Sequence, residues 1–337
     1  MKNLIEWKRA IFQSKMKVAV PIMTHPGVDS CGYSVKKVVT DGAAHAEAIC
    51  AMSRMFPSAA CTVIMDLSVE AEAFGAEVVF AERELPNIVG RLVSDYDSVL
   101  NLSIPSLEAG RIPEYIKANR LAAASIKDKP VFAGCIGPFS LAGRLFDLSE
   151  LMMAVYTEPA TVHLLLEKCT EFIRRYVMAL KAAGTDGVII AEPAAGLISN
   201  DDCLEYSSQY ISRIVREVQD EHFIVILHNC GNRGQCTQAM IASKADGLHF
   251  GNAVDMEQVF VECPDELLVM GNVDPVNIMK YGTPERVKHN VMELLSKLSP
   301  YSNFILSTGC DTPPGVPKEN IEAFYRALNE YNKKVNY

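Results

Sequence analysis

Residues 224–230 read Ile-Val-Ile-Leu-His-Asn-Cys, an apolar run that ends in three polar or reactive side chains. The apolar part is rich in β-branched residues and does not alternate with polar ones, which is typical of a strand buried on both faces of a parallel sheet. Seven other short runs share this buried-strand character: Val18–Met23, Cys61–Asp66, Pro130–Ile136, Gly187–Glu192, Gly247–Gly251, Leu267–Asn272 and Phe304–Cys310. One more apolar run, Ser98–Ile104, is interpreted as loop or edge structure.

Helical patterns lie between these runs. The stretch Pro159–Ala183 has apolar residues at spacings of three and four, a proline in its first turn and Gly184 directly after its end, which predicts a long helix. Thr283-Pro284 predicts the start of another helix, with the threonine as its cap. Pro317 opens a last helix, whose polar end after Tyr331 we expect to fray.

Eight buried strands with helical crossovers predict an α/β protein, a single (β/α)8 TIM barrel. The chain has 337 residues and no Gly/Ser/Pro-rich linker, so we expect one domain over residues 1–337. Residues 1–15 are expected to form a helical extension, and residues 317–337 the C-terminal helix. A doubly wound sheet is the alternative, but it requires a glycine-rich phosphate turn, and residues 24–28 read Thr-His-Pro-Gly-Val.

The amino-acid composition of the chain excludes several classes of function. The net charge of −9 makes a nucleic acid an improbable partner. The N-terminus lacks the apolar core of a signal peptide, and no stretch approaches the ~18 apolar residues of a membrane span, so we expect a cytoplasmic protein without membrane contact. Its ten cysteines should then be reduced, and the absence of Cys-x-x-Cys excludes thioredoxin chemistry.

Function in a TIM barrel resides at the carboxyl ends of its strands. The candidate substrate-binding residues there are His25, Asp66, His249, Asn272 and Asp274. Each of them could equally be an ordinary polar residue at a loop entry. Glu192, at the end of the Gly187–Glu192 run, is the catalytic candidate, because its carboxylate could accept the substrate's proton or occupy an open metal position. The alternative role is a helix cap or a carboxylate that orients His228.

His228 and Cys230 form the most informative pair. Residues i and i+2 of a strand project to the same side, so the imidazole and the thiolate should point together. Cys310 ends the last strand in an equivalent place. One nitrogen and two sulfurs suit zinc, and three protein ligands leave a fourth position for substrate. The alternative is a buried cysteine beside a histidine that hydrogen-bonds a loop, and Cys236 is a potential decoy.

The arrangement His228-x-Cys230 with a distant Cys310 resembles the zinc motif of the methylcobamide:coenzyme M methyltransferases, a branch of the uroporphyrinogen decarboxylase superfamily. The resemblance covers nearly the whole chain. It is carried by Val69–Ala76, Gly137–Ala142, Glu192-Pro193 with Leu197–Ser199, His228–Asn232, Met270–Pro275, Gly309–Asp311 and Pro313–Gly315. It implies Zn²⁺ on His228, Cys230 and Cys310, and a TIM barrel.

The same resemblance implies a methyltransferase that moves a methyl group between a corrinoid, such as methylcobalamin, and a small substrate, here a zinc-activated thiol. Asp220-x-His222 lacks the glycine of a corrinoid-binding motif, because Val225 stands in its place, so the corrinoid should arrive on a separate protein. Nothing in the sequence fixes the direction of transfer. Demethylation of a methyl ether or methylamine onto Co(I) corrinoid is therefore an alternative, with zinc as Lewis acid.

Two further alternatives remain. The decarboxylase branch carries an Arg-Gln-Ala-Gly-Arg stretch after the first strand, which binds the substrate's carboxylates. This chain has no arginine between Arg9 and Arg54, so a tetra-acidic porphyrinogen would lack its bidentate partners there. A non-catalytic binding protein with a structural zinc would normally supply four protein ligands, and only three strand-end ligands are found.

Overall fold

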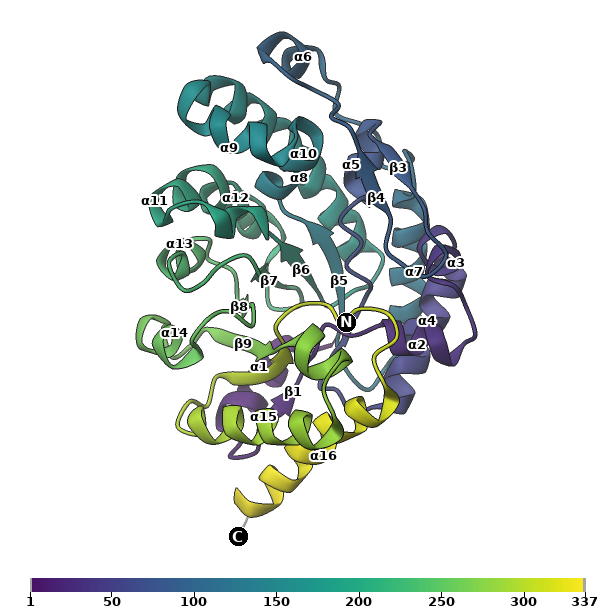
Figure 1. Cartoon of the computed structure of the whole chain (residues 1–337), viewed down its shortest axis with the longest axis vertical. Helices are drawn as coiled ribbons and strands as arrows, with labels where there is room; N and C mark the ends of the chain where they lie inside the picture. Colours follow the sequence, from purple (N-terminus) through teal and green to yellow (C-terminus); the bar gives the residue numbers. More distant parts are fainter. Residues whose placement is uncertain (1, 336–337) are drawn as a thin grey trace.

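Eight parallel strands form one curled sheet, the α/β TIM barrel that the sequence predicts (Figure 1). The computed structural model describes residues 2–335; Met1 and residues 336–337, which the predicted terminal extension and helix include, lie outside the described residues. Neighbouring strands pair in the order β1-β10-β9-β8-β7-β6-β5-β2. Their bounds are β1 (Val18–Ala19), β2 (Cys61–Thr62), β5 (Val131–Ile136), β6 (Gly187–Ala191), β7 (Ile224–Asn229), β8 (Gly247–Phe250), β9 (Leu268–Val273) and β10 (Phe304–Thr308).

Helices surround this sheet (Figure 1). The α-helices are α1 (Leu4–Gln13), α2 (His25–Ser30), α3 (Val35–Thr40), α4 (Gly42–Met55), α5 (Val69–Phe74), α6 (Tyr96–Asn101), α7 (Ile112–Ser125), α8 (Pro138–Phe146), α9 (Leu148–Thr157), α10 (Pro159–Ala182), α11 (Asn200–Cys203), α12 (Gln209–Val218), α13 (Thr237–Ala242), α14 (Met256–Glu262), α15 (Pro284–Lys297) and α16 (Lys318–Val335). Three short helices of other types are η1 (Ala194–Leu197), η2 (Leu204–Ser208) and η3 (Pro275–Lys280). Within residues 2–335, no helix is both long enough and apolar enough to cross a membrane.

The sequence signals for two helices are confirmed. Helix α10 spans 24 residues from Pro159, and Gly184 follows its end with a φ of +97°. That backbone conformation favours glycine, which has no Cβ to clash. Helix α15 begins at Pro284, and the side chain of Thr283 accepts a hydrogen bond from the backbone N–H of Arg286.

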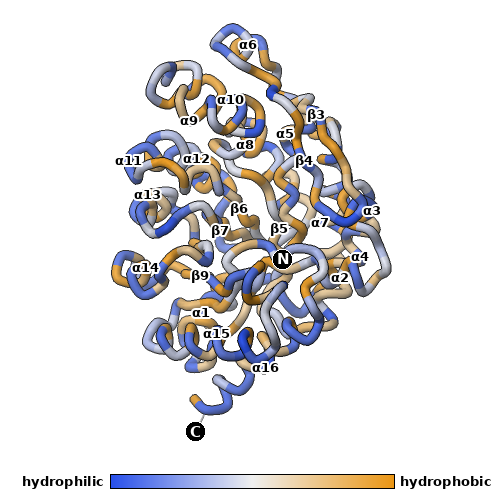
Figure 2. Tube along the Cα trace, viewed as in Figure 1, coloured by the Kyte–Doolittle hydropathy of each residue, from blue (hydrophilic) through white to orange (hydrophobic). Residues whose placement is uncertain are grey.

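Apolar side chains fill both faces of the strands. Hydrophobic colour predominates along the inner strands in Figure 2, whereas the outer helices mix hydrophobic and hydrophilic residues. Inside the barrel, Phe132, Ile189 and Ile226 belong to one buried cluster. Leu4 of α1 belongs to the same cluster, and the Trp7 ring meets Phe132 edge-on at 5.7 Å, so α1 covers the amino end of the barrel. The loops at the opposite, carboxyl end of the barrel contain the candidate functional residues.

Two threonine side chains and a backbone hydrogen bond from the Ala59 N–H to the Ala19 carbonyl join the seam between β1 and β2. These strands do not pair in a backbone ladder within the described residues, and each is two residues long. The Thr62 hydroxyl accepts from the Met23 N–H at 3.2 Å and donates to the Pro21 carbonyl at 3.2 Å. The Thr24 hydroxyl in turn donates to the Thr62 carbonyl at 3.0 Å. These bonds hold the segment that leads into α2 against the second strand.

The predicted first and second strands were too long. Pro21 has no N–H to donate, which interrupts the ladder that would extend β1. Beyond β2, the N–H of Ile64 donates to His45 Nε2 and that of Met65 to the Asp311 carboxylate, rather than to a neighbouring strand. Side chains therefore replace ladder partners at this part of the carboxyl end.

Three other local predictions need correction. Ser98–Ile104 was expected to be loop or edge structure, but its first part lies in α6, where Asp95 and Ser98 form a capping box. An antiparallel hairpin, β3 (Glu77–Val79) with β4 (Asn87–Val89), was missed. Helix α16 continues past Tyr331 to Val335 because Asn332 exchanges two hydrogen bonds with the backbone of Lys17.

Candidate metal centre

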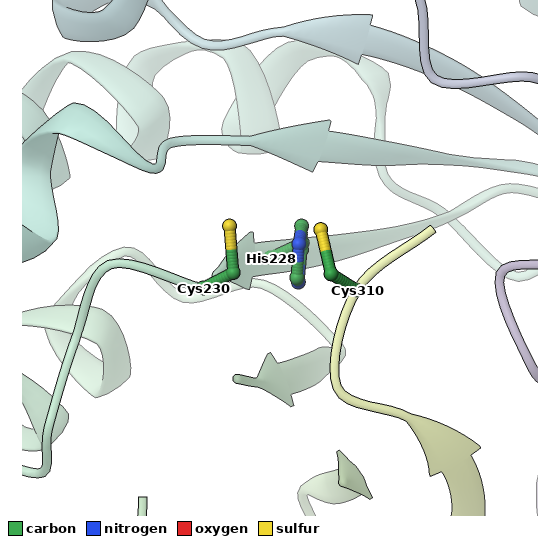
Figure 3. Close-up of side chains that lie close together, drawn as sticks. All are labelled: His228, Cys230 and Cys310. Carbon is green, nitrogen blue, oxygen red and sulfur yellow. The ribbon is translucent and has the colours of Figure 1, made fainter. Parts of the chain in front are cut away.

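His228, Cys230 and Cys310 come together at the carboxyl end of the barrel. His228 is the penultimate residue of strand β7, Cys230 directly follows that strand, and Cys310 lies two residues after the end of β10. Although β8 and β9 separate β7 from β10 in the sheet, curvature brings one ligand atom from each residue within 4.8 Å of the others. Figure 3 shows the imidazole between the two cysteines, whose sulfurs point in the same direction.

The two nitrogens of His228 have different environments. Nδ1 lies 2.8 Å from Nδ1 of His249, which is its neighbour in the β7–β8 register. Nε2 is buried and has no hydrogen-bond partner among residues 2–335. A buried nitrogen without a partner costs about 1–3 kcal/mol, and coordination of a metal would remove that cost.

The two thiols influence each other's ionisation. A hydrogen bond from Cys310 stabilises the thiolate of Cys230 and lowers the pKa of Cys230. The same contact raises the pKa of Cys310, and burial raises it further. The pair of thiols therefore loses its first proton readily and its second proton less readily. Binding of a cation by both sulfurs would displace the second proton.

The donor set fits zinc. One imidazole nitrogen and two thiolates are borderline-soft ligands, and three protein ligands are the usual number in a catalytic rather than a structural zinc site. Cys236, the potential decoy, lies elsewhere: it is buried, and its thiol donates to the carbonyls of Ala195 and Ile198 at 3.6 Å. All ten cysteines are free thiols.

The triad lines a large cavity. The cavity has a volume of about 1180 Å³, and its wall is formed by parts of segments 25–35, 82–85 and 310–315 with Lys280 of η3. A second cavity of about 420 Å³ also borders Cys230 and shares Leu67 and Pro193 with the first. Of the triad, Cys230 lines both cavities, whereas His228 and Cys310 line the large one.

Several polar groups in the large cavity have no partner among the described residues. They are both ring nitrogens of His25, Oδ1 of Asp311 and Oγ1 of Thr312, all in buried residues or shielded from solvent. Burial, with Lys280 as a second cause, lowers the pKa of His25 to about 4, so its ring is neutral near pH 7. Burial also raises the pKa of Asp311 well above its usual value. These groups are available to a ligand that supplies hydrogen bonds.

Glu192 is not part of the cavity wall. Its carboxylate accepts hydrogen bonds from the backbone N–H groups of Phe139 and Ser140 and from the Ser140 hydroxyl, at 2.7–2.9 Å. It thereby satisfies the first turn of α8, and burial raises its pKa to about 7. This geometry matches the capping alternative rather than a proton acceptor at the metal.

Four substrate-binding candidates occupy structural positions. Asp66 is buried and pairs with Arg111 at 2.5 Å, and His249 lies behind His228, away from the cavity. The Asn272 amide donates to the carbonyls of Gly251 and Val254, and Asp274 caps η3. Among the five candidates, the structure places His25 alone in the large cavity.

Other wall residues had no clear sequence signal. Lys280 is the last residue of η3 and lines the large cavity near His25. Glu82–Leu85 reach the cavity from the loop between β3 and β4, which is distant in sequence from any strand of the barrel. Asp311 is different, because the sequence already places it beside Cys310 at the end of the last predicted strand, although it was not among the substrate-binding candidates.

Comparison with known proteins agrees with this architecture. A structure described as a methyltransferase from Methanosarcina mazei superposes with a TM-score of 0.86, over 98% of this chain and 99% of that one, at 21% identity, which shows the same fold. The methylcobamide:CoM methyltransferase MtbA of Methanosarcina acetivorans is 26% identical over 276 residues, covering 81% of this chain and 80% of the relative. The resemblance to that branch is thereby confirmed.

Decarboxylases are similar to about the same degree. The uroporphyrinogen decarboxylase of Serratia proteamaculans is 28% identical over 295 residues, which cover 84% of this chain and 82% of the relative. Identity alone therefore does not separate the two activities. The family profile of uroporphyrinogen decarboxylase (URO-D) matches residues 15–331. The chain therefore belongs to the uroporphyrinogen decarboxylase family.

Proposed function

We propose that this protein is a zinc-dependent methyltransferase that moves a methyl group between a corrinoid, carried by a separate protein, and a small thiol. The observation that carries the proposal is the triad His228, Cys230 and Cys310, whose ligand atoms lie within 4.8 Å of one another beside a cavity of about 1180 Å³. The relatives that include methylcobamide:CoM methyltransferases support the same reaction class.

The residues would divide the work as follows. His228 Nε2 and the sulfurs of Cys230 and Cys310 would hold the metal, and two thiolates balance the charge of a divalent ion. When bound, zinc supplies a Lewis acid that favours the thiolate form of a coordinated substrate sulfur. His25 and Thr312 present unpartnered hydrogen-bonding atoms to the rest of the substrate. Met65 and Leu67 give that part of the wall an apolar surface that displaces water.

The two compartments beside Cys230 suit a reaction with two reactants. An in-line methyl transfer needs the donor and the acceptor on opposite sides of the methyl group. Because Cys230 borders both the large cavity and the smaller one, the corrinoid and the small substrate can approach the centre from separate spaces.

The cavity wall disfavours porphyrinogen decarboxylation. Within the described residues, segment 25–35 contributes no arginine to the wall, but it does contribute Asp29. Glu82 and Glu84 also line the cavity, together with the cationic Arg83 and Lys280. Carboxylates in these positions would repel a substrate with several negative charges, and bidentate guanidinium contacts to it are missing from segment 25–35.

Metal analysis tests the proposal first. We expect about one zinc per chain in the purified wild-type protein and its loss in Cys310→Ala. Cys50→Ala is the matched control, because Cys50 is also a partly exposed free thiol but lies on α4, outside the triad. A fully active wild-type protein without metal, or equal zinc loss in both variants, would contradict the proposal.

Activity tests the direction of transfer. One arm combines the protein with methylcobalamin and a panel of thiols, and the other with Co(I) cobalamin and methyl ethers or methylamines, while the visible spectrum of the corrinoid is followed. We expect demethylation of methylcobalamin in the thiol arm. A response confined to the second arm would reverse the direction, and turnover of a porphyrinogen with no response in either arm would refute the methyltransferase.

A further inference from the structure

A chain of buried side chains leads from His228 across the barrel. His228 Nδ1 contacts His249 Nδ1 at 2.8 Å, and His249 Nε2 contacts the Ser307 hydroxyl at 2.8 Å. The Ser307 hydroxyl contacts the Val20 carbonyl, again at 2.8 Å. These four residues come from β7, β8, β10 and the residue after β1, and each of the three side chains is at most 2% exposed.

The far end of this chain determines where the protons lie. The Val20 carbonyl can only accept, so the Ser307 hydroxyl must donate its single proton to it. The Ser307 oxygen is then an acceptor for His249, which donates from Nε2. A neutral imidazole that donates from Nε2 accepts at Nδ1, so His228 must donate from its own Nδ1.

That assignment leaves His228 Nε2 with a free lone pair. Nε2 has no hydrogen-bond partner within residues 2–335. His228 is the one histidine of the triad, so its free Nε2 is the nitrogen available to a metal. In the opposite tautomer the proton would occupy Nε2 and block coordination. The two rings meet nearly perpendicular, at an interplanar angle of 79° with centroids 4.6 Å apart, so they do not stack. His228 Nδ1 also lies 3.4 Å from the His249 backbone carbonyl, which can only accept and therefore favours the same Nδ1–H form.

We propose that His249 and Ser307 are positioning residues that lock His228 in the Nδ1–H tautomer and so keep Nε2 ready for the metal. This inference rests on the proposed metal site for its purpose. The hydrogen-bond chain itself is a property of the metal-free protein and can be tested there.

Ser307 is the residue to change. In Ser307→Ala the Val20 anchor is lost and His249 can donate from Nδ1 instead, which shifts the His228 proton toward Nε2. The His249 carbonyl still accepts from His228 Nδ1 in this variant, so the two tautomers compete. The matched control is Thr308→Val, because Thr308 is the next residue of β10 and its buried hydroxyl also bonds a carbonyl, that of Ile22 at 3.5 Å. Thr308 contacts His249 through its backbone, which the substitution keeps. His249→Phe removes both nitrogens and serves as a second, more severe variant.

Two measurements separate the hydrogen-bond chain from the metal site. Nitrogen NMR of metal-free protein labelled with [15N]histidine, assigned with His228→Gln, reports which nitrogen of His228 carries the proton. Competition with a chromophoric chelator reports zinc affinity. We expect the Nδ1–H form in the wild type and in Thr308→Val, a changed or mixed tautomer in Ser307→Ala, and zinc affinity about 10-fold weaker in Ser307→Ala than in Thr308→Val.

The inference is overturned if wild-type His228 carries its proton on Nε2. It is also overturned if Ser307→Ala keeps wild-type zinc affinity, or if both single hydroxyl variants lose affinity equally, which would indicate a general packing effect. Thermal midpoints show whether each variant is folded. If the wild type binds no zinc while the tautomer is as expected, the metal site fails and the hydrogen-bond chain stands.

Discussion

Thr62 should have a large influence on stability for a single hydroxyl group. Thr62→Val keeps the shape of the side chain but leaves the Met23 N–H and the Pro21 carbonyl without their partner at the buried seam. Each buried backbone group left unpaired costs about 1–3 kcal/mol, so we expect the free energy of unfolding to fall by about 2–6 kcal/mol. That is a substantial share of the ~5–15 kcal/mol that stabilises a typical domain.

Thr62→Ser is the matched comparison. It keeps the hydroxyl and removes one methyl group, which should cost about 1 kcal/mol. Urea unfolding followed by circular dichroism gives the free energies, and hydrogen exchange of a peptide that covers residues 18–25 reports the Met23 amide. We expect faster exchange in Thr62→Val than in Thr62→Ser. Equal unfolding energies and equal exchange in the two variants would refute the hydrogen-bond explanation of the seam.

Three other perturbations have defined outcomes. Arg111→Met leaves the buried Asp66 carboxylate without its ion-pair partner and should lower the free energy of unfolding, measured by urea titration, by about 3–5 kcal/mol. A decrease of less than about 1 kcal/mol would contradict the importance of this ion pair. Glu192→Gln presents an amide NH2 to the N–H donors of α8 and should lower the free energy of unfolding by about 1–3 kcal/mol. The measurement is thermal or urea unfolding at pH 8, where the wild-type carboxylate is ionised. An unchanged unfolding curve would exclude the capping role. His25, with its pKa lowered to about 4, stays neutral in the folded state, whereas in the unfolded chain it protonates near pH 6.5. Its contribution to the free energy of unfolding is therefore complete above pH 6.5. That contribution is lost as the pH falls toward 4, at about 1.4 kcal/mol per pH unit. His25→Gln should therefore show a shallower loss of stability between pH 6.5 and 4, and an identical slope would refute the buried neutral ring.

The pattern of apolar runs predicted the barrel because burial on both faces leaves a direct trace in each strand. The same pattern overextended β1, since apolar residues continue to Met23 while Pro21 interrupts the hydrogen bonds. The hairpin of β3 and β4 was missed because its strands are three residues long and largely exposed, so burial left no periodic signal in them.

The site was predictable to the extent that strand ends determine it. His228, Cys230 and Cys310 could be grouped because a parallel barrel brings the carboxyl ends of its strands together. Glu192 could not be assigned in advance, because its partners lie on α8, more than 50 residues away in sequence. Asp66 was equally ambiguous, since Arg111 gave no signal that it would turn inward.

The metal ligands and most of the remaining cavity wall come from different halves of the chain. His228, Cys230, His249, Ser307 and Cys310 lie in the last third of the sequence, whereas segments 25–35 and 82–85 supply much of the remaining cavity wall. Substitutions in the first 85 residues can therefore reshape the chamber without touching a ligand or its hydrogen bonds. Substrate preference and metal chemistry can diverge independently in such a chain, so a shared ligand set does not by itself imply a shared substrate.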